Sequence, residues 1–324
     1  MIRVAIIGLG NIARHHAVVL KNLRGARLVA GVKRDRTTGA EFCREFRIPN
    51  YFSSADDLLA WGQFDAAVVS VGHAQTVTVA KAVLRTGRPC LIEKPVGFSA
   101  RETASAARVA TEAGTWGMVG VNRRFYSNIR KALQFAEKAG GLKALLVQQP
   151  EWIHQSAGWG LSPEVLDRYF LVNGIHLIDL MCHAAGMPEQ VCALARSTPG
   201  RRNSYDAFFA FPGQVPGHYV SQWYAPGRWA MDFFAPDLRI RFHSLENATT
   251  QRTGGDEKPL LLDPMDQRYK AGFYRQMRAF VDAIATHTRP ESPACLLEEA
   301  VSVMKIMEAV NRPNGGLRCL RPQR

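Results

Sequence analysis

Residues 2–13 read IRVAIIGLGNIA, an apolar run that leads directly into two closely spaced glycines. The run predicts a buried β-strand, and the segment after it has the period of a helix. Gly8–Ala13 fits the pattern G-x-G-x-x-[G/A] between a strand and a helix, which is the context that a dinucleotide-binding turn requires. Such a turn is therefore predicted at the start of the chain, with a plain strand–helix turn as the alternative.

Each position of this turn suits the role for a physical reason. Gly8 permits a tight turn, Gly10 lets the backbone approach a pyrophosphate, and Ala13 is small enough for close helix–strand packing. The helix that opens at Asn11 and Ile12 presents free backbone N–H groups and a partial positive charge to phosphates. These five residues are the predicted pyrophosphate site.

The strand–helix pattern continues to about residue 121. Short apolar runs at 3–8, 26–32, 65–71, 89–93 and 115–121 alternate with segments of helical period at 11–23, 74–86 and 99–113. This alternation predicts parallel strands joined by crossover helices. We therefore expect residues 1–121 to form an α/β domain with a doubly wound parallel sheet.

The pattern changes after about residue 186. Runs of strand character at 190–197, 204–211, 217–225, 228–235 and 238–244 follow one another closely, separated by turns that contain Pro. Such spacing favours antiparallel strands of one sheet. Because 265–286 and 294–311 return to helical period, we expect residues 122–324 to form an α+β domain with helices on one face of a mostly antiparallel sheet.

The charge balance of the chain is basic. Its 324 residues include 41 Lys and Arg against 28 Asp and Glu, a formal net charge of +13. Such a balance can indicate nucleic-acid binding. The basic residues are spread along the chain, however, without a zinc-finger or RNA-recognition signature. No nucleic-acid partner is therefore predicted, and a preference for anionic small molecules explains the charge as well.

Composition also indicates a cellular setting. Hydrophobic residues make up 47% of the chain and charged residues 21%, which is ordinary for a globular protein. No apolar stretch approaches the roughly 20 residues of a membrane helix, and the first ten residues lack a signal-peptide cleavage site. The six cysteines are scattered without metal-ligand spacing. A reduced, cytoplasmic protein with no membrane partner is expected.

The end of the second predicted strand distinguishes NAD from NADP. An NAD site usually places Asp or Glu there for the ribose hydroxyls. This chain has Lys33 and Arg34 at that place, and a guanidinium suits a phosphate monoester. NADP is therefore favoured. NAD stays the alternative, because a shift of one or two residues would bring Asp35 to the ribose.

Glu93, Lys94 and Pro95 follow directly on the fourth apolar run. They should lie at the carboxyl end of a sheet strand, where doubly wound folds bind ligands. A lysine there can hydrogen-bond a substrate hydroxyl and stabilise the alkoxide as hydride leaves its carbon. We expect Glu93 and Lys94 to line the cofactor site. A surface lysine held by a proline turn is the other interpretation.

Four segments together resemble one family. GLGNIARHH (8–16), EKP (93–95), GVNRRFY (120–126) and GIHLIDL (174–180) occur in the order and spacing of the Gfo/Idh/MocA family, relatives of glucose–fructose oxidoreductase and inositol dehydrogenase. The resemblance covers essentially the whole chain. It implies a Rossmann domain followed by an open-faced antiparallel sheet domain. It also implies redox chemistry at a ring carbon of a sugar or cyclic polyol, and a homodimer or homotetramer formed through the open sheet.

The resemblance implies a role for His176. Its counterpart in the family lies on a helix that faces the nicotinamide and acts as acid and base, and Lys94 matches the catalytic lysine of the EKP motif. An aspartate usually lies four residues before that histidine, where this chain has Val172. Since such a carboxylate orients the imidazole and raises its basicity, His176 should be a less well positioned base. A histidine packed into a helix is the other interpretation.

Polar residues near His176 leave two further possibilities. Asn173 could supply a polar partner or contact the substrate, but it carries no charge. Asp179 and His183 share a helical face with His176, at three and seven residues' distance. A metal cluster could be imagined from these three, but a buried helix face with one satisfied pair is commoner. No metal site is predicted.

The loop after the third apolar run also differs from the family. The family often has T-P-x-x-x-H there, whereas residues 70–76 read SVGHAQT. Ser70, Gly72 and His73 are still expected to bound the cofactor.

Two other regions suggest substrate contacts. The resemblance places Arg123 and Arg124 at the border of the substrate cleft, where one could bind substrate or cofactor and the other could cap a helix or face solvent. Trp159 offers an aromatic face of the kind that suits a sugar ring, although domain interfaces are also aromatic.

These observations predict an NADP-preferring oxidoreductase, with NAD as the second choice of cofactor. It would transfer hydride between the nicotinamide and a carbinol or ketone carbon of a sugar, sugar derivative or cyclic polyol. His176 would take the hydroxyl proton while Lys94 holds the oxygen. The alternative is a non-catalytic dinucleotide-binding sensor or partner-binding protein on the same fold, which Val172 and the altered 70–76 loop favour.

Overall fold

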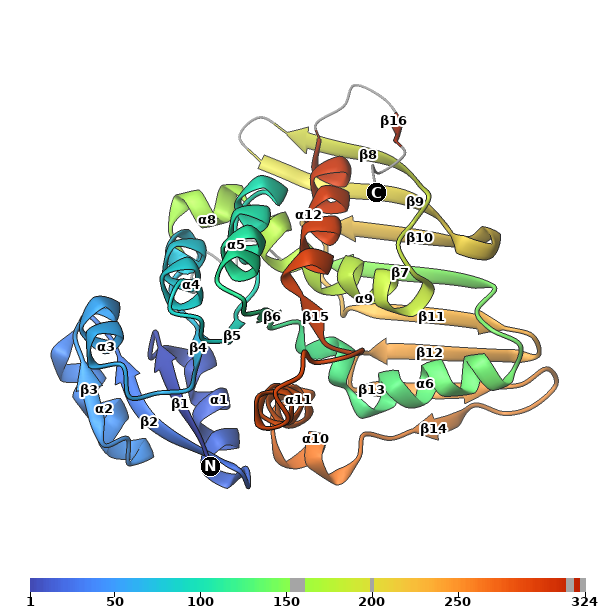
Figure 1. Ribbon diagram of the computed structural model, residues 1–324. Helices are drawn as coiled ribbons and strands as arrows, with labels where there is room; N and C mark the ends of the chain where they lie inside the picture. Colours follow the sequence, from blue (N-terminus) through green and yellow to red (C-terminus); the bar gives the residue numbers. More distant parts are fainter. Residues whose placement is uncertain (152–160, 199–200, 313–317, 321–324) are drawn as a thin grey trace. The chain divides into compact units, whose positions relative to one another are not determined.

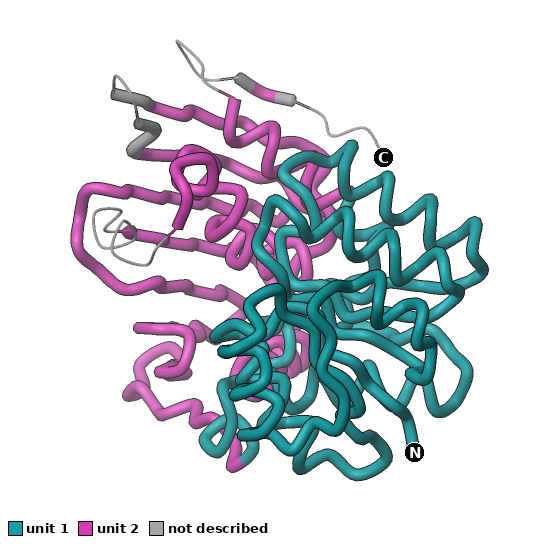
Figure 2. The backbone as a smooth tube through the Cα atoms, turned by 90° about the vertical axis from the view of Figure 1, so that its left-hand side faces the viewer, with its two compact units in different colours: residues 1–125, 265–301 teal, residues 126–264, 302–324 magenta. Residues whose placement is uncertain are grey.

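A computed structural model describes residues 1–151, 161–198, 201–312 and 318–320. The chain divides into two compact units (Figure 2). Unit 1 comprises Met1–Phe125 and Met265–Val301, and unit 2 comprises Tyr126–Pro264 and Ser302–Arg324. The sequence analysis ended the first domain at residue 121 and assigned everything after it to the second. Residues 265–301 instead pack with unit 1, because they contribute a helix and a strand to its core and sheet.

Unit 1 is a doubly wound sheet, as predicted. Its elements are β1 (Ile2–Ile7), α1 (Asn11–Asn22), β2 (Ala26–Val32), α2 (Arg36–Phe46), β3 (Asn50–Phe52), α3 (Ala55–Trp61), β4 (Ala66–Val69), the 3-10 turn η1 (His73–Gln75), α4 (Thr76–Leu84), β5 (Cys90–Ile92), α5 (Ala100–Glu112), β6 (Gly117–Val119), the 3-10 turn η2 (Asn122–Phe125), α10 (Pro264–Arg268), α11 (Phe273–Ala285), β15 (Cys295–Leu296) and the start of α12 (Leu297–Asn311). The strand order is β15-β6-β5-β4-β1-β2-β3, parallel except for β15. The chain therefore reverses its winding between β1 and β4, which is where doubly wound folds bind ligands.

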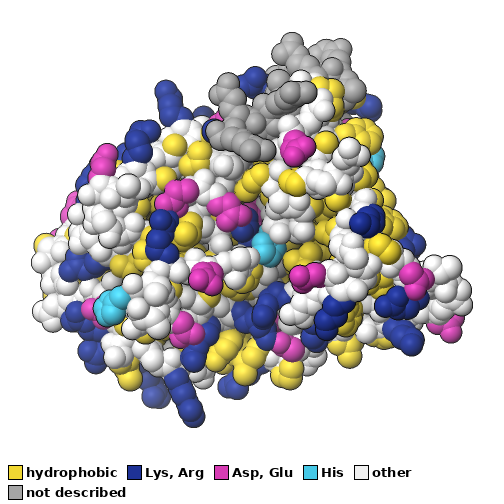
Figure 3. All heavy atoms as spheres, turned by 45° about the vertical axis from the view of Figure 1, so that its right-hand side comes forward, with side chains coloured by type: hydrophobic (Ala, Val, Ile, Leu, Met, Phe, Trp, Pro, Cys, Tyr) yellow, Lys and Arg dark blue, Asp and Glu magenta, His cyan; other side chains and the backbone are white. Residues whose placement is uncertain are grey.

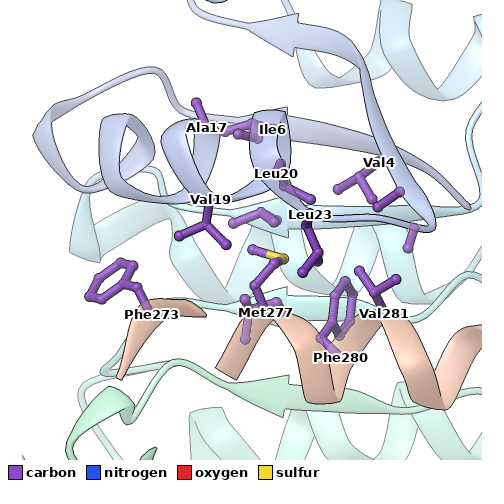
Figure 4. Close-up of a cluster of buried hydrophobic side chains, with 14 of the residues drawn as sticks. Val4, Ile6, Ala17, Val19, Leu20, Leu23, Phe273, Met277, Phe280 and Val281 are labelled. Atoms are coloured by element: carbon purple, nitrogen blue, oxygen red, sulfur yellow. The ribbon is translucent and has the colours of Figure 1, made fainter. Parts of the chain in front are cut away.

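Two apolar cores lie on the two faces of this sheet. One core joins β1 to α1, α2 and α11, and the other joins the sheet to α3, α4 and α5. In the first core, Phe273, Met277 and Phe280 of α11 point toward α1 and β1 (Figure 4). Val4 and Ile6 of β1 are fully buried there. Helix α11 thus covers a sheet face that residues 1–121 alone would leave open.

Unit 2 is built on one large sheet. Its elements are α6 (Ser127–Lys138), β7 (Ala144–Pro150), α8 (Pro163–Asp167), the π-helical turn η4 (Phe170–Gly174), α9 (Ile175–Ala185), β8 (Gln190–Thr198), β9 (Arg201–Phe211), η5 (Pro212–Gln214), β10 (Val215–Gln222), β11 (Ala230–Ala235), β12 (Leu238–Ser244), β13 (Asn247–Gln251), β14 (Lys258–Leu260), β16 (Arg318–Leu320) and the rest of α12. The strand order is β14-β13-β12-β11-β7-β10-β9-β8-β16. All pairs are antiparallel except β7 with β10. The predicted mostly antiparallel sheet is confirmed.

Helices α6 and α9 lie on one face of this sheet (Figure 1). The strands alternate accordingly: in β9 the side chains of Ala207 and Phe209 are buried, whereas Phe208 is 55% exposed. The ring of Phe208 stacks on that of His218 on the neighbouring strand, with ring centroids 4.3 Å apart. The face opposite the helices therefore displays an aromatic pair.

The expectation of fully reduced cysteines is corrected for one pair. Cys192 on β8 and Cys319 on β16 stand directly opposite each other and form a disulfide. Their separation of 127 residues in the sequence gave no sign of this pairing, since strand register decides it. The other four cysteines are free and buried.

Basic side chains are scattered rather than gathered on the face drawn in Figure 3, where acidic and apolar side chains lie among them. Within the described residues, no helix combines the length and the apolar character needed to cross a bilayer. The cytoplasmic location stays a prediction.

Candidate functional site

A cavity of about 610 Å³ opens at the carboxyl ends of β1, β2 and β4 in unit 1. Six predicted cofactor residues line it: Gly8, Gly10, Lys33, Arg34, Ser70 and Gly72. Ser53, Ser54, Gln75 and Thr78 line it as well and were not predicted. The cavity coincides with the reversal of winding between β1 and β4, so the fold and the cavity point to the same ligand position.

Gly8 and Gly10 of the turn have different structural roles. Gly8 has φ +95°, and a Cβ there would lie 2.5 Å from the carbonyl oxygen of Ser70. Gly10 has nothing within 4 Å of its Cβ position, so the backbone is open to a ligand on that side. Gly10 also precedes α1 without a side-chain cap, and the first turn of α1, which holds Asn11, Ile12 and Ala13, has no acidic residue. The uncapped N–H groups and the helix dipole suit a pyrophosphate.

Asp35, the alternative ribose ligand, is engaged elsewhere. It is the N-cap of α2, and its Oδ1 accepts hydrogen bonds from the backbone N (2.8 Å) and the hydroxyl (2.5 Å) of Thr38. These hydrogen bonds lower the pKa of the Asp35 carboxyl. Lys33 and Arg34 line the cavity instead, and the hydroxyl of Tyr51 holds the Lys33 carbonyl at 2.7 Å. The end of β2 thus offers cations to the ligand.

The end of β5 carries a second group of ionisable residues. Nε2 of the fully buried His16 lies 2.8 Å from Oε1 of Glu93. Burial alone would raise the pKa of Glu93, but the His16 hydrogen bond and the charges of His16 and Lys94 hold it below its ordinary value. Gly120 makes room for this carboxylate, since a Cβ there would meet all its atoms at 3.0–3.2 Å.

His73 belongs to the same region. Desolvation and the charge of Lys94 lower the pKa of His73 to about 4. The imidazole is therefore neutral at physiological pH. His73, Glu93 and Lys94 do not line the 610 Å³ cavity, although Gly72 and Ala74 on either side of His73 do.

The two arginines of the 120–126 segment have protein partners. Arg124 is 1% exposed, and its Nη1 pairs with Oε1 of Glu299 at 2.8 Å. Arg123 donates from Nη1 to Oδ1 of Asn122 at 2.6 Å. A helix-capping or solvent-facing role was expected for one of the two arginines, but Arg124 is buried and holds an ion pair with the partly exposed Glu299 instead.

In unit 2, His176 lies in the first turn of α9 and is 3% exposed. Its ring faces that of Trp229, with centroids 5.8 Å apart. Val172 is 5% exposed in the preceding turn, and Asp179 is 1% exposed one turn later. Among the described residues, no cluster of three or more His, Cys, Asp or Glu side chains could hold a metal ion. Trp159 lies outside the described residues.

Asn173 belongs to a hydrogen-bond network around Glu151, which directly follows β7. Oε1 of Glu151 accepts from Nδ2 of Asn173 (2.6 Å), Nε1 of Trp229 (3.0 Å) and Nε2 of Gln149 (3.1 Å). Gln149 in turn accepts from the Tyr219 hydroxyl at 2.8 Å. The sequence analysis missed this network. Its only sign was an acid placed directly after a short apolar strand.

Residues 2–121 match the family model of oxidoreductases with an NAD-binding Rossmann fold, the Gfo/Idh/MocA model. The domain formed by residues 2–121 is therefore similar to the NAD-binding domain of the Gfo/Idh/MocA oxidoreductases. The resemblance inferred from the glycine turn and the EKP triplet, both within residues 2–121, is confirmed.

Known proteins extend the likeness beyond this domain. The mouse trans-1,2-dihydrobenzene-1,2-diol dehydrogenase is 26% identical over 230 residues, 68% of each chain. The putative oxidoreductase YceM of Salmonella typhimurium is 25% identical over 326 residues, 96% of this chain and 97% of the relative. An aldose–aldose oxidoreductase from Caulobacter crescentus has the same fold, with a TM-score of 0.83, 17% identity and 99% of each chain covered.

Proposed function

We propose that this protein is an NADP-preferring oxidoreductase that acts on a CH–OH group of a sugar, sugar derivative or cyclic polyol. The observation that carries the proposal is the cavity of unit 1, where an uncapped helix N-terminus and two cations at the end of β2 meet. A pyrophosphate and a 2′-phosphate need these groups. When bound, the nicotinamide would accept or supply the hydride. The dehydrogenases and the aldose oxidoreductase among the similar proteins support the substrate class.

The chain's own residues then divide the remaining work. Lys94 would donate a hydrogen bond to the substrate oxygen and stabilise its negative charge as the C–H bond breaks. His176 would take the hydroxyl proton in oxidation and return it in reduction. Glu93, fixed by His16, would keep a negative charge beside Lys94.

Cofactor choice is tested by fluorescence titration with NADPH and NADH. Arg34→Ala removes a guanidinium from the cavity, and we expect NADPH affinity to fall roughly 10- to 100-fold, the loss of one charge-assisted hydrogen bond of about 1.5–3 kcal/mol. NADH affinity should change little. Arg36→Ala, an exposed arginine that does not line the cavity, is the matched control. A wild type that prefers NADH would overturn the NADP assignment.

Turnover is tested with neutral polyols, aldoses, sugar acids and nucleotide sugars, following the cofactor's absorbance. A preference for anionic substrates would agree with the net charge of +13. Lys94→Ala should lower kcat by about 10²- to 10⁴-fold while cofactor affinity is retained. If cofactor binds but wild type and Lys94→Ala are equally inactive toward every substrate, the non-catalytic sensor replaces the enzyme.

A further inference from the structure

The turn that precedes α9 is apolar at the position four residues before His176. Val172 is 5% exposed within η4, and its neighbour Leu171 is also 5% exposed. The turn that precedes α9 therefore offers His176 no charge of its own. A carboxylate that orients His176 would come from Asp179, one turn later on α9, or from another element of unit 2.

Glu151 is such a carboxylate. One oxygen, Oε1, accepts three N–H donors at 2.6–3.1 Å, from Asn173, Trp229 and Gln149. Three donors to one carboxylate stabilise its ionised form and fix its position. Because the donors come from η4, β7 and the segment before β11, the carboxylate is fixed to the framework that also carries His176.

Two of these donors connect Glu151 to His176. Asn173 lies three residues before His176, so its bond to Glu151 joins the carboxylate to the turn that opens α9. Trp229 donates to Glu151 through Nε1, and its ring lies 5.8 Å from the imidazole of His176, centroid to centroid. The Glu151 carboxylate and the His176 imidazole are thus connected through the Trp229 indole and the Asn173 amide.

The elements that pack against α9 carry few other ionisable groups. They are η4, β7 and β10, and Met307 of α12 lies near Gly174. Glu151 follows β7, β10 contributes His218 and Tyr219, α12 contributes Lys305 and Glu308, and α9 itself carries Asp179, Cys182 and His183. Asp179 is the main competing carboxylate, since it lies one helical turn from His176.

We infer that Glu151 is the positioning residue for His176, and that it acts from the end of β7 through Trp229 and Asn173. The inference rests on the proposed function for its catalytic meaning. Glu151 favours the protonated imidazole electrostatically, and it holds Trp229, whose ring lies beside the imidazole, and Asn173 of the preceding turn.

The first test needs neither cofactor nor substrate. Imidazole signals are followed by ¹⁵N NMR against pH in the full chain, with the His176 signal assigned by its loss in His176→Asn. In Glu151→Gln, which keeps the shape and removes the charge, we expect the pKa of His176 to fall by about 1 pH unit. Glu189→Gln, an exposed acid that precedes β8, is the matched control and should leave it unchanged.

Two results would overturn the inference. One is an unchanged pKa of His176 in Glu151→Gln. The other is a larger fall in Asp179→Asn than in Glu151→Gln, which would assign the role to Asp179. Thermal unfolding of each variant checks that the fold is retained. If Glu151→Gln does not fold, Glu151→Asp is used instead, because it keeps the charge but has a shorter side chain. Only a positioning role of Glu151 predicts that Glu151→Asp shifts the pKa of His176.

The second test separates this inference from the proposed function. If wild type turns over a substrate, Glu151→Gln should lower kcat about 10- to 100-fold, shift the acidic limb of the pH profile of kcat/KM to lower pH, and leave cofactor affinity unchanged. Glu151→Asp should restore part of kcat. Unchanged kcat in Glu151→Gln would overturn the inference alone, whereas absence of turnover in wild type would overturn the proposed function and leave the NMR result to decide on Glu151.

Discussion

The half-buried imidazole of His73 gives unit 1 a pH dependence of its own. Desolvation first, and the charge of Lys94 second, lower the pKa of His73 to about 4. Between about pH 6.5 and pH 4 the unfolded chain binds a proton at this position that the folded protein does not. The free energy of unfolding therefore decreases as the pH falls through this window, and is unaffected by His73 above it.

Replacing this histidine isolates its contribution. Between pH 7 and pH 4, wild type should lose about 2 kcal/mol more unfolding free energy than His73→Gln, after allowance for solvent screening at a half-buried site. Urea denaturation at both pH values measures the difference. Equal losses in the two proteins would mean that His73 titrates normally in the folded state.

At the same scale, Asp35 shows what a single sequence can and cannot decide about the site. Lys33 and Arg34 directly follow a predicted strand, and both line the cavity of unit 1. The alternative role of Asp35 as a ribose ligand stayed open, because the sequence alone did not show where α2 begins. Only the hydrogen bonds to Thr38 show that Asp35 caps that helix.

The strand–turn–helix element that opens the chain provides a matched pair of variants. A methyl group at Gly8 would clash with the Ser70 backbone and sit on a residue with φ +95°, whereas at Gly10 it would enter open space. We expect Gly8→Ala to lower the free energy of unfolding by about 2–4 kcal/mol from backbone strain and overpacking. Gly10→Ala should leave stability nearly unchanged and weaken NADPH binding, because the methyl group blocks the approach of the phosphates.

Calorimetry and cofactor titration on both variants check this division of roles. A Gly10→Ala protein that binds NADPH as tightly as wild type would show that the phosphates do not approach this part of the backbone. A Gly8→Ala protein of wild-type stability would mean that the turn can open away from β4.

Helix α11 supplies another prediction at this scale. Phe280 is fully buried in the core of unit 1 and meets the ring of Trp116 edge-on, with centroids 5.6 Å apart. Phe280→Ala should cost about 3–5 kcal/mol of unfolding free energy. It should also change the fluorescence of Trp116 in the folded protein. A cost below 1 kcal/mol would mean that α11 contributes little to this core.

Whether a strand could be predicted from the sequence depends on how it is buried. Strands β1, β2, β4, β5 and β6 are covered on both faces and read as continuous apolar runs. Strand β3 is half-buried and left no such run. In β7 the inward position Gln149 is polar and satisfied by Tyr219, so the alternation was broken. The missed strand β7 is the one that Glu151 directly follows.

Residues 265–301 illustrate a different limit. The helical period of 265–286 was recognised, although it is interrupted between α10 and α11. An apolar helix face in the sequence, however, does not indicate which surface the helix will pack against. Assignment of α11 to unit 1 therefore required the packing of Phe273, Met277 and Phe280 against α1 and β1.

At the scale of the whole molecule, the open face of the unit 2 sheet invites self-association. The strand register pairs four residues in one row across neighbouring strands of this sheet: Cys192, Phe208, His218 and Leu146. Phe208 is 55% exposed, and a large aromatic ring that is left in water carries an unfavourable hydration cost. We propose that two copies of the chain associate through this face and cover the row.

Introducing a charge at the centre of the proposed apolar contact is the sharpest test of this interface. Phe208→Glu places a carboxylate at the centre of the row, where burial against a second copy would cost several kcal/mol. Light scattering coupled to size exclusion should show a dimer or tetramer for wild type and a monomer for Phe208→Glu, with unfolding temperature little changed. Phe135→Glu on α6, an exposed phenylalanine on the helix-covered face, is the control and should keep the wild-type mass. A monomeric wild type, or a Phe208→Glu protein that keeps the oligomer, would show that the exposed aromatic pair serves another purpose.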